Sequence, residues 1–171
     1  MQPDFSKLFG KKKIAPLYYQ ARSGSCFAHD IHFLSGYLHD ARFFPNTVMK
    51  SGKKISIEFE RDCWEFGYTQ RDGSLELHIA KSRLTIKPVS RIHWDVSDPK
   101  IFSKEVWIEN IYLGSSHWEV SNASELVISA PHTGCKLSIS IADDFGDIRL
   151  DDLEVPYLYS VRKAQQDKLR V

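Results

Sequence analysis

The chain lacks several features that would place it at once in a functional class. It has no apolar run longer than a few residues, whereas a membrane-spanning helix needs about 20, so we expect no membrane segment. It has only three cysteines, an odd number without a close pair, which fits neither a disulfide framework nor a zinc knuckle. It also lacks an excess of either charge, since 23 lysines and arginines stand against 22 aspartates and glutamates. The resulting net charge of +1 gives no general attraction to nucleic acids or membranes.

Motifs for catalysis and for export are missing as well. There is no Gly-x-Ser-x-Gly elbow and no glycine-rich phosphate loop, which favours a protein that is not an enzyme. The start of the chain, residues 1–5, does not show the basic region followed by an apolar run that a secretory signal has. We therefore expect a cytoplasmic protein without a cofactor, whose cysteines are buried, unreactive thiols.

What is present is the composition of one ordinary globular domain. The 171 residues include four tryptophans, seven tyrosines and ten phenylalanines, and a chain of this length buries roughly two-thirds of the surface of its unfolded form. The lysine-rich residues 1–22 are predicted to form a basic, partly ordered arm. Residues 23–156 are predicted to form a single β-rich domain, and residues 157–171 a C-terminal tail or short helix.

Residues 26–42 are predicted to form the one amphipathic helix. Apolar side chains recur there at intervals of four, three, four and three residues, which is the period of one helical face. These side chains are Phe27, Ile31, Leu34, Leu38 and Ala41. The Ser-Gly-Ser sequence at residues 23–25 offers an N-cap, and Pro45 prevents the helix from continuing beyond about residue 43.

After residue 45 the apolar period changes from helical to alternating. Residues 55–60, 75–80 and 137–142 alternate apolar and polar side chains, as half-buried strands of an antiparallel sheet do. Turn signals separate further strands, which we expect near residues 64–69, 83–95, 105–113, 117–121, 125–130 and 147–155. The predicted fold is mostly β, in the α+β class: an antiparallel β-meander or sandwich with one N-terminal amphipathic helix.

Histidines and aspartates gather on the polar face of the predicted helix. His29 and His32 lie three residues apart, a spacing at which two imidazoles can hold one metal ion. His39 and Asp40 follow on the same side, but His39 lies about 10.5 Å from His32 along a helix that rises about 1.5 Å per residue. The pattern favours a solvated polar face. It leaves a metal-dependent hydrolase that uses His29, His32, His39 or Asp40 as the alternative function.

The C-terminal part of the chain is acidic. Six acidic residues surround the single base Arg149. They are Asp143, Asp144, Asp147, Asp151, Asp152 and Glu154. Their spacing differs from that of an EF-hand, so we expect a solvated edge that attracts a basic partner rather than a calcium site. Asp147, Asp151 and Asp152 are the candidate binding residues of this edge.

Two tryptophans are candidates for an exposed binding surface. If Val106 and Ile108 point into the core, Trp107 between them points outward, and Trp94 is expected to do the same. Outward tryptophans are typical of surfaces that bind a partner. Trp107 is therefore the fourth candidate binding residue.

Three short motifs occur in an order that is found in a group of bacterial proteins. The chain has Leu-His-Asp-Ala-Arg-Phe at residues 38–43, Ser-Arg-Leu-Thr-Ile at residues 82–86 and Phe-Gly-Asp-Ile-Arg-Leu at residues 145–150. Over residues 38–156 the chain thus resembles bacterial single-domain β-rich proteins of unknown function, some of which are regarded as toxin-immunity proteins. The resemblance implies a binding protein without catalytic residues, in which His39 and Asp40 form a structural joint between the helix and the first strand.

The function predicted from the sequence is a non-enzymatic binding or interaction protein of the immunity type, with an unidentified protein partner. We expect no nucleic-acid partner, because the three lysines at residues 11–13 supply little affinity at physiological salt. The oligomeric state is left open.

Overall fold

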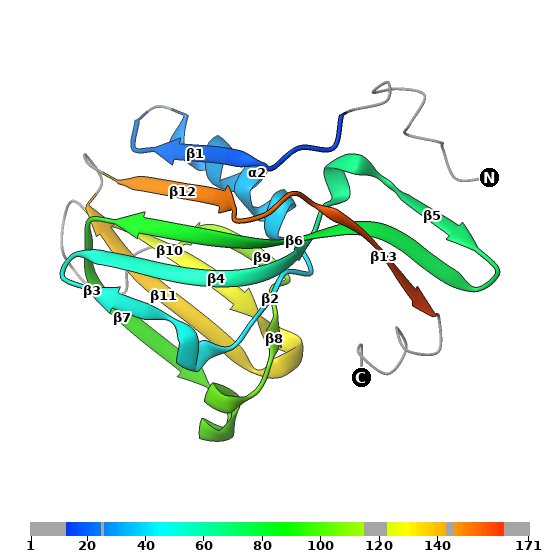
Figure 1. The fold of residues 1–171 in the computed structure, drawn as a ribbon. Helices are drawn as coiled ribbons and strands as arrows, with labels where there is room; N and C mark the ends of the chain where they lie inside the picture. The colour runs from blue at the N-terminus through cyan, green and yellow to red at the C-terminus, as the bar shows by residue number, and fades with distance from the viewer. Residues whose placement is uncertain (1–12, 25, 115–122, 143–145, 163–171) are drawn as a thin grey trace.

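The structure is a computed structural model that describes residues 13–24, 26–114, 123–142 and 146–162 (Figure 1). In this part of the chain two antiparallel β-sheets pack face to face, and there is a single α-helix. The predicted mostly-β fold of the α+β class is therefore confirmed. Within the same ranges, no helix has the length and apolar character needed to cross a membrane.

The larger sheet contains nine of the described strands. Its main path runs in the order β1, β12, β6, β4, β2, β8. These strands are β1 (Tyr18–Arg22), β12 (Asp147–Asp152), β6 (Ser74–Lys87), β4 (Lys54–Asp62), β2 (Arg42–Phe43) and β8 (Val106–Trp107). Three further strands lie off this path: β3 (Met49–Ser51), β5 (Tyr68–Arg71) and β13 (Tyr157–Arg162). Strand β6 is 14 residues long, and its first half lies between β5 and β13 while its second half lies between β4 and β12.

The smaller sheet has the strand order β7, β11, β10, β9. These strands are β7 (Val89–Val96), β11 (Cys135–Ala142), β10 (Ala123–Ala130) and β9 (Asn110–Gly114). The connections include four 3-10 helices: η1 (Pro45–Thr47), η2 (Trp64–Phe66), η3 (Pro99–Ser103) and η4 (Pro131–Thr133). The chain passes from β6 to β7 at Pro88, whose peptide bond with Lys87 is cis. The single strand predicted for residues 83–95 is therefore divided between the two sheets.

The core lies between the inner faces of the two sheets. Along β4, Ile57 and Phe59 are buried while Glu58 between them is exposed, as the alternating pattern predicts. The smaller sheet contributes Leu137 and Ile139, which are both 0% exposed. We call the face of each sheet that meets this core the inner face, and the opposite face the outer face.

Helix α2 (Phe27–Leu38) packs against β9 of the smaller sheet and β1 of the larger one. The apolar face predicted from the spacing is buried at Phe27, Ile31, Leu34 and Leu38. The helix ends before the predicted residue 42, because Asp40 adopts a left-handed backbone conformation with a φ of 63° and Arg42 already belongs to β2. Its N-cap is Cys26, whose side chain makes no capping hydrogen bond, and not one of the predicted residues 23–25.

Both ends of the domain differ from the prediction. Residues 18–22, predicted as part of the arm, form the edge strand β1 on β12, whereas residues 1–12 lie outside the described residues. Residues 157–162, predicted as a tail or short helix, form β13, because their alternating side chains match those of β6: Tyr157 lies opposite Ile79 and Tyr159 opposite Leu77. The strand predicted at 117–121 also lies outside the described residues.

Two other predicted strands are interrupted. The segment 64–69 consists of η2 followed by β5, and the segment 105–113 consists of β8 followed by β9.

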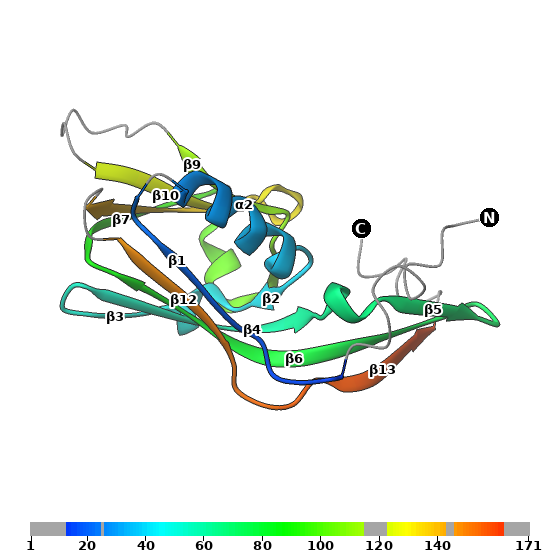
Figure 2. The same cartoon turned by 90° about the horizontal axis from the view of Figure 1, so that it is seen from above.

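One part of the larger sheet extends beyond the two-layer body. Figure 2 shows β5, the first half of β6 and β13 continuing past the end of the smaller sheet. We call this three-stranded part the wing. Because the smaller sheet ends before it, the wing depends on its own side chains and on its base for stability.

Candidate interaction surface

Large rings collect on the outer face of the wing. The register puts Tyr68 of β5 and Tyr159 of β13 opposite the same residue, Leu77 of β6, and Tyr157 opposite Ile79. Residues directly opposite each other in an antiparallel pair share a face, so the three tyrosines stand on one face. Tyr68, Tyr157 and Tyr159 are 44%, 45% and 46% exposed, whereas Leu77 and Ile79 are 3% exposed. We call the three tyrosines the aromatic surface.

Trp107 lies farther along the same outer face. Its neighbours Val106 and Ile108 are buried, at 0% and 1% exposure, so the outward orientation predicted for Trp107 is confirmed, while its role in binding stays a prediction. Arg42 of β2 lies opposite Trp107, and its guanidinium carbon is 5.0 Å from the centre of the ring. This distance is within the range of a cation–π interaction.

A charged cluster links Trp107 to the aromatic surface. Arg42 donates hydrogen bonds from Nη2 to Glu60 Oε1 and to Asp62 Oδ1, both at 3.0 Å. Asp62 lies opposite Ile79, which in turn lies opposite Tyr157. The cluster therefore borders the tyrosines. We call Arg42, Glu60, Asp62 and Trp107 the Arg42 cluster.

The border of the aromatic surface is acidic. Burial raises the pKa of Asp62, and the carboxylates of Asp40 and Glu60 raise it further, against the lowering effect of Arg42. Burial raises the pKa of Tyr157 too, and the charges of Glu60 and Glu154 add to this. Tyr157 is therefore a neutral phenol at physiological pH, and Glu60, whose side chain is 43% exposed, is an accessible carboxylate beside it.

Trp64 fixes the other border of the aromatic surface. Its ring meets that of Tyr68 edge to face, with centres 6.0 Å apart, and its Nε1 donates a hydrogen bond to the carbonyl of His39 at 3.2 Å. The backbone N–H of Asp40 donates to the carbonyl of Ile108 at 2.9 Å. His39 and Asp40 thus form a joint between α2 and β2, and this joint also holds η2 in place.

A fully buried ion pair lies on the inner face at the base of the wing. Arg61 of β4 is 0% exposed and donates two hydrogen bonds to Asp152, at 2.9 and 2.8 Å, and two to Glu65, at 3.1 and 2.7 Å. Asp152 also accepts hydrogen bonds from Ser82 Oγ at 2.6 Å and from the N–H of Leu17 at 2.7 Å. The network connects β4, β6, β12, η2 and the residue before β1.

Both members of this pair are charged in the folded protein. Burial acts to raise the pKa of Asp152, but the hydrogen bonds from Arg61, Ser82 and Leu17 outweigh it and lower the pKa. Burial acts to lower the pKa of Arg61, but its bonds to Asp152 and Glu65 raise it. Four of the five guanidinium N–H groups are used within the network, so we interpret it as a structural anchor.

The acidic edge predicted for the C-terminal part is divided between the two faces of β12. The side chain of Asp152 is 0% exposed and pairs with Arg61, so its prediction as a solvated binding residue is wrong. Asp147 and Asp151 lie on the outer face, where Asp147 is paired with Arg149 at 3.2 Å. The division follows from the strand period, which turns successive side chains to opposite faces.

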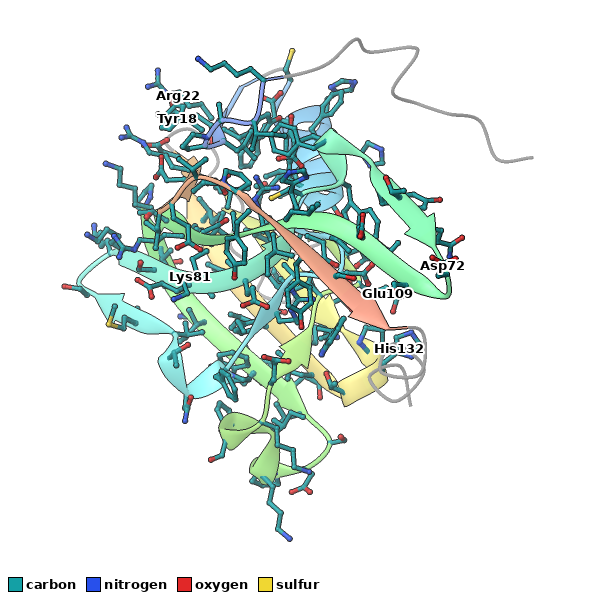
Figure 3. The ribbon with its side chains drawn as sticks, turned by 45° about the vertical axis from the view of Figure 1, so that its right-hand side comes forward. Tyr18, Arg22, Asp72, Lys81, Glu109 and His132 are labelled. Atoms are coloured by element: carbon teal, nitrogen blue, oxygen red, sulfur yellow. The ribbon has the colours of Figure 1, made fainter. Side chains whose placement is uncertain are left out.

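The remaining acidic residues do not complete a patch in the part of the chain that is described. Glu154 accepts a hydrogen bond at 3.2 Å from the backbone N–H of Lys81, a residue of β6 that is labelled in Figure 3. Asp143 and Asp144 lie outside the described residues.

The histidines of α2 face away from the core, as predicted. His29 and His32 are exposed, and the ring of His29 lies 4.8 Å from that of Phe33. Across the described ranges, no group of three or more histidine, cysteine, aspartate and glutamate side chains is arranged to hold a metal ion. A metal site at His29 and His32 stays a prediction.

Two smaller predictions about single residues are wrong. Trp94 packs against the core and contacts Phe102, with ring centres 5.2 Å apart, because it shares a strand face with Ile92 two residues before it. Cys26 is exposed, whereas we expected all cysteines to be buried.

The two other cysteines fit the prediction of buried thiols. Cys63 and Cys135 are buried, and burial raises their pKa values to about 12 and about 11. Thiols that are protonated and covered are poor nucleophiles.

Fold and surface together define a class: a two-layer, mostly-β domain with antiparallel sheets and an exposed aromatic surface on a projecting wing. No protein-family model, no curated protein and no solved structure matches the chain. The resemblance to bacterial toxin-immunity proteins therefore stays a prediction.

Proposed function

We propose that the protein is a non-catalytic binding protein and that its partner, another protein, binds at the aromatic surface. The observation that carries this proposal is the group of three tyrosines, each 44–46% exposed, on one face of the wing. The few residues that carry most of the binding energy in protein interfaces are enriched in tyrosine, tryptophan and arginine, and large exposed apolar patches mark interaction sites. The proposed site is thus the wing rather than the acidic edge, with Trp107 at its border.

The chemistry of the surface fits a protein better than a nucleic acid. Tyrosine rings offer apolar area with a polar tip, and the Arg42 cluster supplies the polar rim that surrounds the centre of a typical interface. The carboxylates of Glu60, Asp62 and Glu154 beside Tyr157 would repel the phosphates on which nucleic-acid affinity depends. We therefore expect no nucleic-acid partner.

The resemblance to immunity proteins makes a toxin the first class of partner to test. Such a partner would be bound and blocked without any chemical step in this chain. The product of a neighbouring gene is the first candidate.

The test compares two tyrosines on the outer face of the same sheet. Tyr18 of β1 is 58% exposed and lies at the far end of the sheet from the wing tip at Asp72 (Figure 3). We expect Tyr157→Ala to weaken binding of the candidate partner at least about tenfold, as loss of an interface anchor does, and Tyr18→Ala to leave it unchanged. Surface plasmon resonance measures both. Equal affinities for the two variants would contradict the proposed site.

If the neighbouring gene product does not bind, the same pair of variants can be used as baits. A protein retained by the wild type and by Tyr18→Ala, but lost from Tyr157→Ala, would support the site without the toxin class. Loss from both variants would contradict it.

A further inference from the structure

Most edges of the two sheets are protected against the addition of another strand. Folded proteins achieve this with short strands, charges or a covering helix. Strand β9 is covered by α2, and the N–H of Ile111 donates to Ser35 Oγ at 2.8 Å. Strand β7 carries Arg91 and Asp95, and α2 packs against β1. Strands β3, β5 and β8 are only three, four and two residues long.

Strand β13 is the exception among the described edges. It is six residues long and has no charged residue before Arg162. Tyr157, Leu158 and Tyr159 are 45%, 61% and 46% exposed, so large apolar side chains are open on both faces. Within the described ranges it pairs with β6 and with no other strand.

We propose that this edge of β13 pairs with β13 of a second copy of the chain, so that a dimer forms with one continuous sheet across the two wings. An antiparallel pair centred on Tyr159 puts this residue opposite its own copy. It also puts Tyr157 opposite Val161 of the partner subunit and Leu158 opposite Ser160 of the partner subunit. Residues opposite each other share a face, so the apolar outer stripe meets itself.

The charge and shape of this edge fit a second copy of the chain as the strand that pairs with it. The first five residues of β13 are uncharged, so self-pairing brings no like charges together, and Arg162 falls opposite Pro156 of the partner subunit. A two-fold axis requires such a self-complementary surface. The wing projects from the two-layer body (Figures 1 and 2), so its edge can be approached away from the body. The dimer is held by the backbone edge of β13 and the proposed partner binds the outer face of the wing, but Tyr157 and Tyr159 take part in both. Tyr68, which lies only on the face, separates the two.

The interface is small, because it consists of one strand pair and its side chains. Interfaces at the low end of the size range are weak and reversible. We therefore expect a dimer whose dissociation constant lies in the micromolar range, so that monomer and dimer exchange on dilution.

Sedimentation velocity of the full chain over micromolar concentrations tests the proposal. The wild type should shift from monomer to dimer as concentration rises. Tyr159→Lys, and separately Tyr159→Glu, should each raise the dissociation constant at least about tenfold, because like charges then lie opposite each other on the axis. An equimolar mixture of the two variants should associate again, because lysine then faces glutamate.

Tyr68→Lys is the matched control. Tyr68 and Tyr159 are the same residue type, are 44% and 46% exposed and lie opposite the same Leu77, but Tyr68 is on β5 and away from the proposed contact. Tyr68→Lys should therefore dimerise like the wild type. The proposal is overturned if the wild type stays monomeric, if both lysine variants behave alike, or if mixing the Tyr159 variants does not restore association.

Discussion

Replacing Asp152 with asparagine tests the buried anchor at the base of the wing. Asp152 accepts four hydrogen bonds, two from Arg61 and one each from Ser82 and the Leu17 N–H. The asparagine side chain has nearly the same shape but carries no charge. It therefore leaves the buried guanidinium of Arg61 with Glu65 as its remaining carboxylate partner.

The expected loss of stability follows from this geometry. Removing one partner of a buried ion pair costs about 3 to 5 kcal/mol. Glu65 remains bound to Arg61, and the asparagine oxygen can still accept from Ser82 or Leu17, so we expect the lower end of the range, about 3 kcal/mol. For a domain of this size about 1 kcal/mol shifts the melting temperature by roughly 2–4 °C, so the expected shift is roughly 6–12 °C.

The neighbouring residue provides the control. Asp151→Asn makes the same chemical change on the outer face of β12, where the side chain is only half-buried, so it should change stability by less than about 0.5 kcal/mol. Urea denaturation of both variants measures the difference. Equal losses for the two variants would refute the reasoning that separates the inner and outer faces of β12.

The same pair predicts a dependence on pH. The pKa of Asp152 is held below its ordinary value of 3.8 in the folded protein. Its carboxylate therefore stabilises the fold above that value, and the contribution is lost as the pH falls through the lower pKa of the folded state. The stability difference between the wild type and Asp152→Asn should shrink on acidification below about pH 4; a difference that grows there would contradict the assignment.

Three further predictions concern packing. Leu34→Ala should cost about 2 to 5 kcal/mol, because Leu34 is fully buried, whereas His32→Ala should cost less than about 0.5 kcal/mol; similar losses in denaturation would show that the histidine face is packed. In the native protein a thiol reagent should label Cys26 and reach Cys63 only after unfolding, and rapid labelling of more than one thiol would contradict this burial. Tyr159→Ala should lower stability by about 2 kcal/mol, because roughly half of this large ring is buried and that burial is lost, while Tyr159→Phe should change stability little. Equal losses for the alanine and phenylalanine variants in thermal melts would argue that the ring does not cover Leu77.

The sequence predicted those elements whose pattern is local. The apolar face of α2 depends on residues within four positions of one another, and every member of it that lies in the helix is buried. The end of the helix depends on the contact of Asp40 with Ile108, which no local pattern contains. Strand β13 was predicted as a tail or short helix because its alternating side chains indicate a strand only when they are seen to pair with Leu75, Leu77 and Ile79 of β6.

The candidate site was harder to predict for the same reason. Tyr68 and Tyr159 are separated by about half the chain and meet only because both flank Leu77. For the acidic segment the sequence did contain the necessary information. Asp152 lies two residues after Leu150 and four after Ile148, so the two-residue period of a strand assigns all three side chains to the same, inner face. The prediction gave more weight to the run of acidic residues than to this period. It did not identify Arg61 as the buried partner of Asp152, because arginines are rarely fully buried.

The aromatic surface has two roles that act through the same rings. Because the smaller sheet ends before the wing, the tyrosines that flank Leu77 and Ile79 help to bury them, and they remain half-exposed because nothing described in the structure lies over them. The Arg61 network holds the base of the wing by connecting β4, β6 and β12. A partner that binds here would meet rings already fixed by Leu77, by Trp64 and by this base, and would therefore lose little side-chain entropy on binding. Substitutions at Tyr68 and Tyr159 should disturb the cover over Leu77 to a similar extent, so a difference between them in association reports on the edge of β13 and not on folding.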